Sequence, residues 1–275
     1  METQLFQRFA ALAYEKAGIS IKPGKEALVS ARVAKRLRAL SISDAESYLR
    51  YLEEDQSGEE LVRFLDVIST HFTSFYRERD HFELLEMEIT GLVEAGQRRI
   101  RIWSAASSTG EEPYSIAMTA LGVKGVERLD LKILATDIAA DTLRQAAQGC
   151  YAAARMEPVP PELRARWFVH KADPLDPLAE TWEARPELKS RIAFRRLNLA
   201  EPPFPMQGPF DVVFCRNVLI YFDQPTRQRL LSAVERLLRP GGLLCIGHTE
   251  TLSGIHSSFK MERPSVFRRA GEAGP

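Results

Sequence analysis

From about Arg98 onward, short runs of apolar and β-branched residues alternate regularly with segments of helical character. Strands that alternate with helices form parallel sheets, because each helix carries the chain back across a face of the sheet. This alternation predicts an α/β fold with a doubly wound parallel sheet. The predicted strands cover residues 100–103, 131–135, 192–194, 211–215 and 243–246, and the predicted helices cover 111–121, 139–148 and 225–238.

The two ends of the chain depart from this pattern. Near the carboxyl terminus, residues 259–262 and 265–268 have the composition of two short strands and predict a closing antiparallel hairpin. In the first seventy residues, apolar side chains recur at helical spacing and strand-like runs are missing. We therefore predict an all-helical domain at residues 1–70, followed by an α/β domain at residues 71–275.

One segment interrupts the alternation, at about residues 150–190. Proline removes a backbone donor and breaks helices, and it recurs here too often for a single crossover helix. We predict an inserted subdomain, for which a partner-binding role and simple packing both remain open. The prolines are Pro158, Pro160, Pro161, Pro174, Pro177 and Pro186.

Overall charge excludes some classes of partner. The 37 Lys and Arg residues equal the 37 Asp and Glu residues in number, so no net field draws the chain to nucleic acid or to a membrane. The chain shows neither a signal-peptide pattern at its start nor an apolar run of about 18 residues. Cys150, Cys215 and Cys245 lack metal-ligand spacing, and two of them lie in strand-like runs. We expect a cytoplasmic protein without membrane insertion, disulfide or metal site.

Residues directly after the strands are the first candidates for a site, because ligands of open α/β sheets bind beyond the strands' carboxyl ends. After the first strand comes a turn of small residues that opens a helix at Glu111 and Glu112. Thr109 with Glu112, or Ser108 with Glu111, fits a capping box. Two carboxylates here disfavour a phosphate, which binds to bare helix N-termini. A cationic ligand such as S-adenosylmethionine fits better, although simple capping by the two glutamates remains open.

Polar side chains also follow the next three strands. Asp137 ends the second strand, where an acid can accept hydrogen bonds from ribose hydroxyls. We expect it to face solvent and to bind ribose, although Asp is also a common turn former. Asn198 follows the third strand, and Arg216 and Asn217 follow the fourth. These side chains indicate a cleft at this edge of the sheet.

Taken together, several motifs resemble the bacterial chemotaxis receptor methyltransferase family, CheR, over nearly the whole chain. The resemblance implies a class I methyltransferase fold, Rossmann-like, with a helical amino-terminal domain and a small inserted β subdomain. It also implies transfer of a methyl group from S-adenosylmethionine to glutamate side chains of chemoreceptor cytoplasmic helices, giving γ-methyl esters and S-adenosylhomocysteine. The motifs are Thr73-x-x-x-Arg77, residues 103–115, Ala135-Thr136-Asp137-Ile138 and residues 214–222.

By this likeness, a set of residues matches the cofactor-binding positions, and Arg77 and Tyr221 would lie near the transferred methyl as catalytic residues. His71 departs from the Asn that many relatives have in the cofactor wall, and Ala139 replaces an acid often found there. The insert matches least, so the grip that some relatives have on a receptor tail is not carried over. The cofactor-binding set is His71, Thr73, Arg77, Glu111, Asp137, Asn198, Leu199, Arg216 and Asn217.

A predicted helix near residues 29–40 has one basic side, formed by Arg32, Lys35, Arg36 and Arg38. This side is a candidate for docking onto an acidic receptor helix, and an ordinary solvated charged face is the alternative. Nucleic-acid binding is disfavoured because aromatic residues do not alternate with the basic ones.

Two other functions remain open at this point. One is a non-catalytic module of methyltransferase fold that senses S-adenosylmethionine or binds a signalling partner, against which the intact Arg77, Asp137, Asn217 and Tyr221 argue. The other is methylation of a different substrate, such as a small molecule or RNA. Neither the receptor nor the oligomeric state follows from the sequence.

Overall fold

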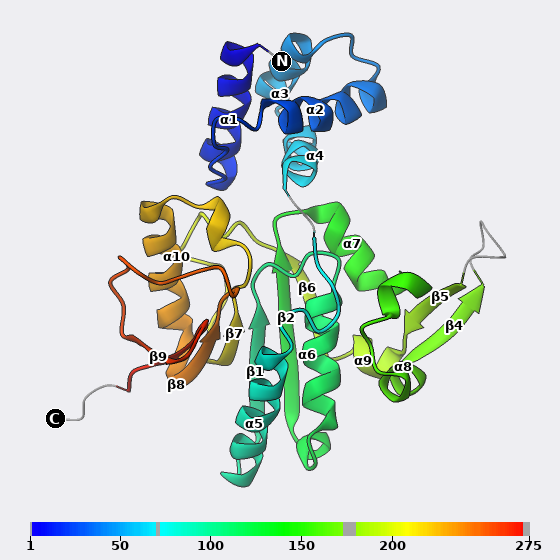
Figure 1. Ribbon diagram of the computed structural model, residues 1–275, viewed down its shortest axis with the longest axis vertical. Coiled ribbons are helices and arrows are strands. Elements are labelled where there is room, and N and C mark those ends of the chain that lie inside the picture. The colour runs from blue at the N-terminus through cyan, green and yellow to red at the C-terminus, as the bar shows by residue number, and fades with distance from the viewer. Residues whose placement is uncertain (1, 70–71, 173–179, 272–275) are drawn as a thin grey trace.

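The computed structural model describes residues 2–69, 72–172 and 180–271. Four helices stand at one end of a seven-stranded sheet, and a small three-stranded sheet lies at its side (Figure 1). The helical start of the chain, the α/β sheet and the inserted subdomain predicted above are all present.

The amino-terminal helices pack around a small aromatic core. Phe9, Tyr48 and Phe64 are fully buried, with ring centroids 5.6 to 6.4 Å apart. Apolar residues recur every three or four positions, so each helix turns one face inward. The helices are α1 (Thr3–Ala17), α2 (Glu26–Leu40), α3 (Ala45–Glu54) and α4 (Glu59–Ile68).

The main sheet has the strand order β6-β2-β1-β7-β8-β10-β9. The first five strands in this order are parallel, and β10 pairs antiparallel with both β8 and β9. All five predicted strands and the closing hairpin are confirmed. The strands are β1 (Arg99–Ser104), β2 (Asp130–Asp137), β6 (Ile192–Arg196), β7 (Phe210–Phe214), β8 (Leu238–Cys245), β9 (Phe259–Arg263) and β10 (Val266–Arg269).

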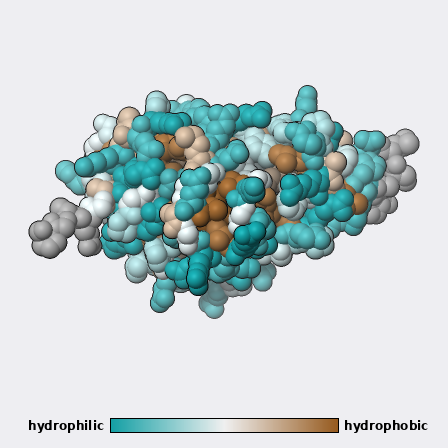
Figure 2. All heavy atoms as spheres, turned by 90° about the horizontal axis from the view of Figure 1, so that it is seen from below, coloured by the Kyte–Doolittle hydropathy of each residue, from teal (hydrophilic) through white to brown (hydrophobic). Residues whose placement is uncertain are grey.

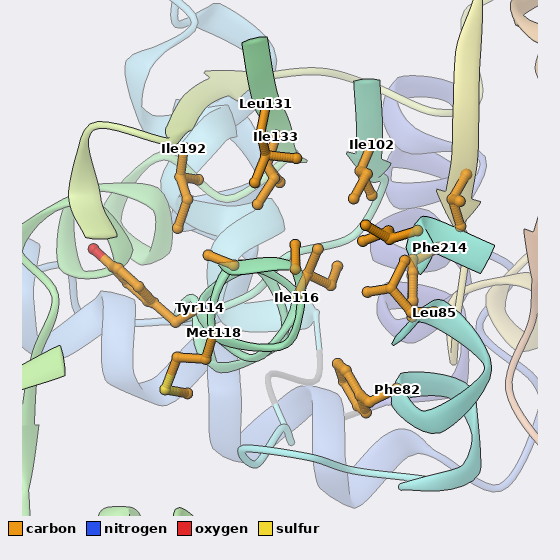
Figure 3. Close-up of a cluster of buried hydrophobic side chains, with 14 of the residues drawn as sticks. Phe82, Leu85, Ile102, Tyr114, Ile116, Met118, Leu131, Ile133, Ile192 and Phe214 are labelled. Carbon is orange, nitrogen blue, oxygen red and sulfur yellow. The ribbon is translucent and has the colours of Figure 1, made fainter. Parts of the chain in front are cut away.

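Helices cover both faces of the sheet, because neighbouring side chains of a strand point to opposite faces. Ile102 belongs to the core that α5 and α6 share with one face (Figure 3), and Trp103 belongs to the core that α10 covers on the other. Burial removes apolar surface from water on both sides, so the sheet forms a rigid base for its loops. These helices and α7 are α5 (Asp80–Glu94), α6 (Glu111–Gly122), α7 (Ala140–Gln148) and α10 (Gln224–Leu237).

The predicted insert is a separate antiparallel sheet of order β3-β5-β4. It is fastened to the α/β part by aromatic contacts: Tyr151 and Phe168 lie 4.9 and 5.9 Å, centroid to centroid, from Phe75. Residues 173–179, which include two of the predicted prolines, lie outside the described residues. Its elements are β3 (Cys150–Ala152), α8 (Pro161–Trp167), β4 (Phe168–Ala172), β5 (Glu180–Ala184) and α9 (Pro186–Lys189).

The strand order reverses at β1, which pairs with β2 on one side and with β7 on the other. At such a switch point the loops leave in opposite directions and open a crevice. The helices α1–α4 stand over this end of the sheet.

The cysteines and the surface complete the description. Cys215 and Cys245, which lie in or beside strands, are buried free thiols, whereas Cys150 is exposed. Within the described residues, no helix is both long enough and apolar enough to span a membrane. On the face opposite the helical domain, hydrophilic residues dominate, with hydrophobic residues gathered toward the middle (Figure 2).

Candidate active site

A pocket lies at the switch point, between the carboxyl ends of the strands and helices α1 and α4. It has about 960 Å³ of space between its atoms, part of it open to solvent. The predicted site residues that line it are Thr73, Arg77, Asp137, Asn198, Leu199, Arg216, Asn217 and Tyr221.

Among the predicted residues that the structure describes, Glu111 is not part of this lining. The Glu111 side chain is fully buried and pairs with Arg155 of the insert instead. The Thr109 hydroxyl also donates a hydrogen bond of 2.7 Å to the Glu111 carboxylate. Glu111 therefore joins the α/β part to the insert. His71 lies outside the described residues.

Asp137 is held at the end of β2 by the backbone. Its two carboxylate oxygens accept hydrogen bonds from the amides of Ser108, at 2.8 Å, and Ala139, at 3.0 Å. The residue is only 9% exposed, which corrects the expectation that it faces solvent. A carboxylate has about four lone-pair sites, so two acceptor sites remain for a ligand in the pocket.

The turn after β1 has a different cap from the predicted one. Gly110 is the N-cap of α6, with φ of 98° and no capping side chain, so both predicted capping boxes are wrong. Glycine is required here, because a Cβ atom would lie 2.7 Å from the Tyr151 hydroxyl as well as at an unfavourable φ. The neighbouring Glu112 instead accepts a hydrogen bond of 2.7 Å from Ser104.

Arg216 forms the centre of a buried ion-pair network. Its guanidinium donates to Glu78 at 3.0 Å and to Glu112 at 2.8 Å, and it also bonds the carbonyl of Arg77. The Arg216 side chain is 1% exposed. Burial raises the pKa of the Glu112 carboxyl, and the Arg216 charge opposes this shift. Since most of its donors bind other groups of the protein, the main role of Arg216 is to hold the pocket wall together.

Glu250 supports the site from outside the pocket lining and was not predicted from the sequence. Its carboxylate accepts hydrogen bonds from the amides of Gly247 at 2.7 Å, Asn217 at 2.8 Å and Ile220 at 3.2 Å. It therefore ties the loop after β8 to the loop after β7. The strand-end rule, applied to β8 as it was to the other strands, would have found this residue. Glu78, also missed, directly follows the motif residue Arg77.

Two pocket residues have left-handed backbones without being glycine. Ser108 has φ of 47° and Asn217 has φ of 56°. Such conformations are unfavourable and persist only where the surroundings hold them. Here the holding groups are carboxylates: Asp137 binds the amide of Ser108, and Glu250 binds the amide of Asn217.

The helical domain closes the pocket from above through direct hydrogen bonds. The Asn198 side-chain amide donates to the carbonyl of Lys16 at 2.9 Å, and the Ser20 amide donates to the carbonyl of Tyr221 at 2.8 Å. A Cβ at Gly18 would lie 2.7 Å from the Cβ of Ala200, so the end of α1 packs tightly on the sheet domain. Two predicted site residues thus also join the two domains.

Arg77 borders the same pocket and is anchored on one side. Its guanidinium donates to the carbonyl of Phe72 at 2.8 Å and lies 5.4 Å from the centroid of the Phe72 ring. The Phe72 side chain is 75% exposed. Arg77 therefore has a fixed position with donors left for a ligand.

The basic side of α2 divides into two kinds of residue. Arg36 forms two hydrogen bonds, of 2.8 and 2.7 Å, with the buried Glu60, and Arg32 bonds the carbonyl of Ile68. Lys35 and Arg38 are exposed. The docking prediction is therefore revised for Arg36 and Arg32, whose bonds hold α2 to α4.

The pocket fits the cofactor that the resemblance implied. Asp137 retains acceptors for two ribose hydroxyls, and Ile138 and Leu199 provide apolar surface for a base. The lining holds two carboxylates, of which Glu112 is paired with Arg216, whereas Asp137 is left to attract a cationic ligand. The fold and this pocket define an S-adenosylmethionine-dependent methyltransferase.

Comparison with known protein families also identifies a methyltransferase. Residues 71–267 match the profile of the "CheR methyltransferase, SAM binding domain", and residues 4–69 match the "CheR methyltransferase, all-alpha domain". The chain belongs to the CheR methyltransferase family.

Curated relatives cover almost the whole chain. It is 37% identical to the "Chemotaxis protein methyltransferase" of Salmonella typhimurium, over 95% of this chain and 88% of that protein. It is 38% identical to the protein of the same name from Escherichia coli, over 95% and 89%. It is 40% identical to "Chemotaxis protein methyltransferase 2" of Pseudomonas aeruginosa, over 92% and 88%.

Proposed function

We propose that this enzyme methylates glutamate side chains on the cytoplasmic helices of chemoreceptors and releases S-adenosylhomocysteine. The observation that carries the proposal is one pocket that combines a carboxylate with unused acceptors, Asp137, with a guanidinium and a phenol, Arg77 and Tyr221. The names of the curated relatives support a role in chemotaxis. We propose that the enzyme acts in the cytoplasm, where such receptor segments lie.

We propose the domain division made above, with a boundary at residue 70 and the insert at about 150–190. For the bound cofactor, we propose that Asp137 binds the ribose and that Leu199 packs against the base. Thr73, Asn198 and Asn217 complete the wall. When bound, S-adenosylmethionine supplies a methyl group on a sulfonium, which is already activated for transfer.

The residues of the pocket need only position the substrate. A glutamate side chain has a reference pKa of about 4.3 and is ionised at neutral pH, so no general base is required. Arg77 pairs with that carboxylate and replaces its water, and Tyr221 orients it by a hydrogen bond. Arg77 must not hold the carboxylate too tightly, because its charge disappears as the ester forms.

The receptor helix docks, in this proposal, on the exposed basic residues Lys35 and Arg38 of α2. Their charges are available because no ion pair to either is found among the described residues. Arg32 and Arg36 support this surface from below through their bonds to α4.

The direct test uses S-adenosylmethionine with a labelled methyl group and receptor cytoplasmic fragments. We expect label on the fragment and its release as methanol by mild base, the behaviour of a methyl ester. Label that resists base would indicate N- or C-methylation of another substrate. Cofactor binding without transfer to any fragment would indicate a non-catalytic module.

The base-free mechanism has its own test. Tyr221→Phe removes one hydroxyl, and we expect a modest loss of kcat with a flat rate profile between about pH 6 and 9. An acid limb in the wild-type profile that disappears in Tyr221→Phe, together with a large loss of kcat, would show that Tyr221 transfers a proton.

A further inference from the structure

Beside the pocket wall, three potential metal ligands come together. One ligand atom each from Glu78, His81 and His248 lies within 4.8 Å of the others. Glu78 precedes α5, His81 lies in its first turn, and His248 follows β8. The His81 side chain is fully buried, Glu78 is 12% exposed and His248 is 47% exposed. The cluster therefore lies at the surface with a buried base.

Hydrogen bonding determines where the neutral His81 ring carries its proton. The Ser265 hydroxyl gives its one hydrogen to the carbonyl of Pro264, at 2.6 Å. It therefore acts as the acceptor in its 2.8 Å contact with Nε2 of His81. The ring proton is on Nε2, and Nδ1 presents a lone pair. This Nδ1 is buried and has no hydrogen-bond partner in the part of the chain that the structure describes.

The lone pair of Nδ1 faces another acceptor. Oε2 of Glu78 lies 3.5 Å from Nδ1 of His81. A cation at the usual zinc distance of about 2.1 Å from each atom would bind both with an angle of roughly 113°, close to tetrahedral. Oε2 also accepts from Nη2 of Arg216 at 3.0 Å and from Nε of Arg216 at 3.3 Å. A bound cation would replace the longer of these two hydrogen bonds.

The third ligand, His248, has a carboxylate beside its Nε2 atom, so its other ring nitrogen, Nδ1, would bind the cation. Nε2 of His248 lies 3.0 Å from the carboxylate of Asp80. Carboxylates that bond a ligand histidine fix its orientation and raise its basicity. The two imidazole rings lie 5.1 Å apart, centroid to centroid, in an edge-to-face arrangement.

The local charge suits a divalent cation. Arg216 and the N-terminus of α5 disfavour a cation at this place. Three carboxylates favour it, namely Glu78, Glu112 and Asp80. With Arg216 counted, these side chains carry a net charge of two negative units, which a divalent ion neutralises.

We propose that Glu78, His81 and His248 bind a divalent transition-metal cation, with Zn²⁺ as the best match to one carboxylate and two imidazole ligands. The sequence predicted no metal site, because its cysteines lack ligand spacing and His81 and His248 lie far apart in the chain. The site links α5 and the loop after β8 to Glu78, which in turn holds Arg216 and Asn217 in the pocket wall. Its role is structural.

The test is a titration of the untagged full chain, stripped of metal, with Zn²⁺ by calorimetry. We expect one ion per chain with a Kd in the micromolar range or tighter. His248→Ala should weaken binding at least tenfold, and it should fold because His248 is half exposed. His170→Ala is the matched control, since His170 is 49% exposed and lies 3.9 Å from a carboxylate, that of Glu180. Its Zn²⁺ affinity should equal that of the wild type.

Co²⁺ gives a second readout that does not depend on enzyme activity. Bound by these ligands, it should show the visible absorption of tetrahedral cobalt in the wild type and in His170→Ala, but not in His248→Ala. Absence of saturable Zn²⁺ binding, or equal loss in the two variants, would overturn the proposal. Failure of methyl transfer to receptors would leave these results unchanged, so the two proposals are tested separately.

Discussion

The two sides of the cofactor pocket differ in how their charged groups are used. On the β2 side, Asp137 binds two backbone amides and keeps acceptors for a ligand. On the β7 side, Arg216 has most of its donors bound to Glu78, Glu112 and a carbonyl. Both residues lie at the carboxyl end of a strand, so position alone predicts a ligand role for both. A residue that binds the ligand differs from one that only supports the pocket in how many of its hydrogen-bonding groups the protein leaves unused.

The largest expected effect is a loss of stability when Arg216, on the β7 side of the pocket, is replaced. Arg216→Met leaves Glu78 and Glu112 as buried carboxylates without their partner, a loss of about 3–5 kcal/mol in the free energy of unfolding. Urea unfolding measures this, with the exposed Arg128→Met as control. A variant that keeps wild-type stability but loses affinity for S-adenosylhomocysteine would make Arg216 a ligand instead.

On the ligand side, Asp137→Ala should act mainly on the cofactor. Loss of charge-assisted hydrogen bonds of about 1.5–3 kcal/mol corresponds to a roughly tenfold to hundredfold weaker Kd for S-adenosylhomocysteine by calorimetry. Because Ser108 and Ala139 also lose their acceptor, stability should fall by about 1–2 kcal/mol. The exposed Asp141→Ala should change neither quantity by a comparable amount. Unchanged affinity in Asp137→Ala would contradict the ribose assignment.

A smaller effect is expected for Glu250, which supports the pocket without lining it. Glu250→Gln replaces one of the oxygens that bind the amides of Gly247, Asn217 and Ile220. We expect a loss of about 1 kcal/mol in stability and a few-fold rise in KM for the cofactor with kcat nearly unchanged. Steady-state kinetics with the exposed Glu157→Gln as control checks this. A fall in kcat without a change in KM would place Glu250 in the chemical step.

The smallest effect concerns α2. Here Arg36 is bound to Glu60, whereas Lys35 and Arg38 are exposed and can bind a partner. Replacing Lys35 and Arg38 with Ala should raise KM for the receptor fragment a few-fold and reduce its salt dependence, because exposed charges mainly steer encounter. Arg36→Ala should instead lower stability. A receptor KM that is insensitive to Lys35 and Arg38 would remove them from the docking surface.

The sequence predicts the architecture well because alternating apolar runs are a local signal. All five parallel strands and the hairpin follow from it. The insert was predicted from its prolines, and its β structure from the family resemblance. The position of Asp137 at the end of a strand predicted it as a site residue, but the sequence did not predict that its side chain is buried. The partners of Arg216 and Arg36 were not predictable, since Glu78 lies 138 residues from Arg216 and Glu60 lies 24 from Arg36. Both capping boxes are wrong because the N-cap is Gly110, which has a left-handed backbone and no side chain that could accept a hydrogen bond.

A crystal structure of the complex with S-adenosylhomocysteine tests the contrast between the two sides most directly. The quantity to measure is the set of hydrogen bonds at Asp137 and at Arg216. We predict that both ribose hydroxyls donate to the Asp137 carboxylate while Arg216 stays bonded to Glu78 and Glu112. A structure in which Arg216 has left the two glutamates to bind the ligand, with the ribose away from Asp137, would contradict this account.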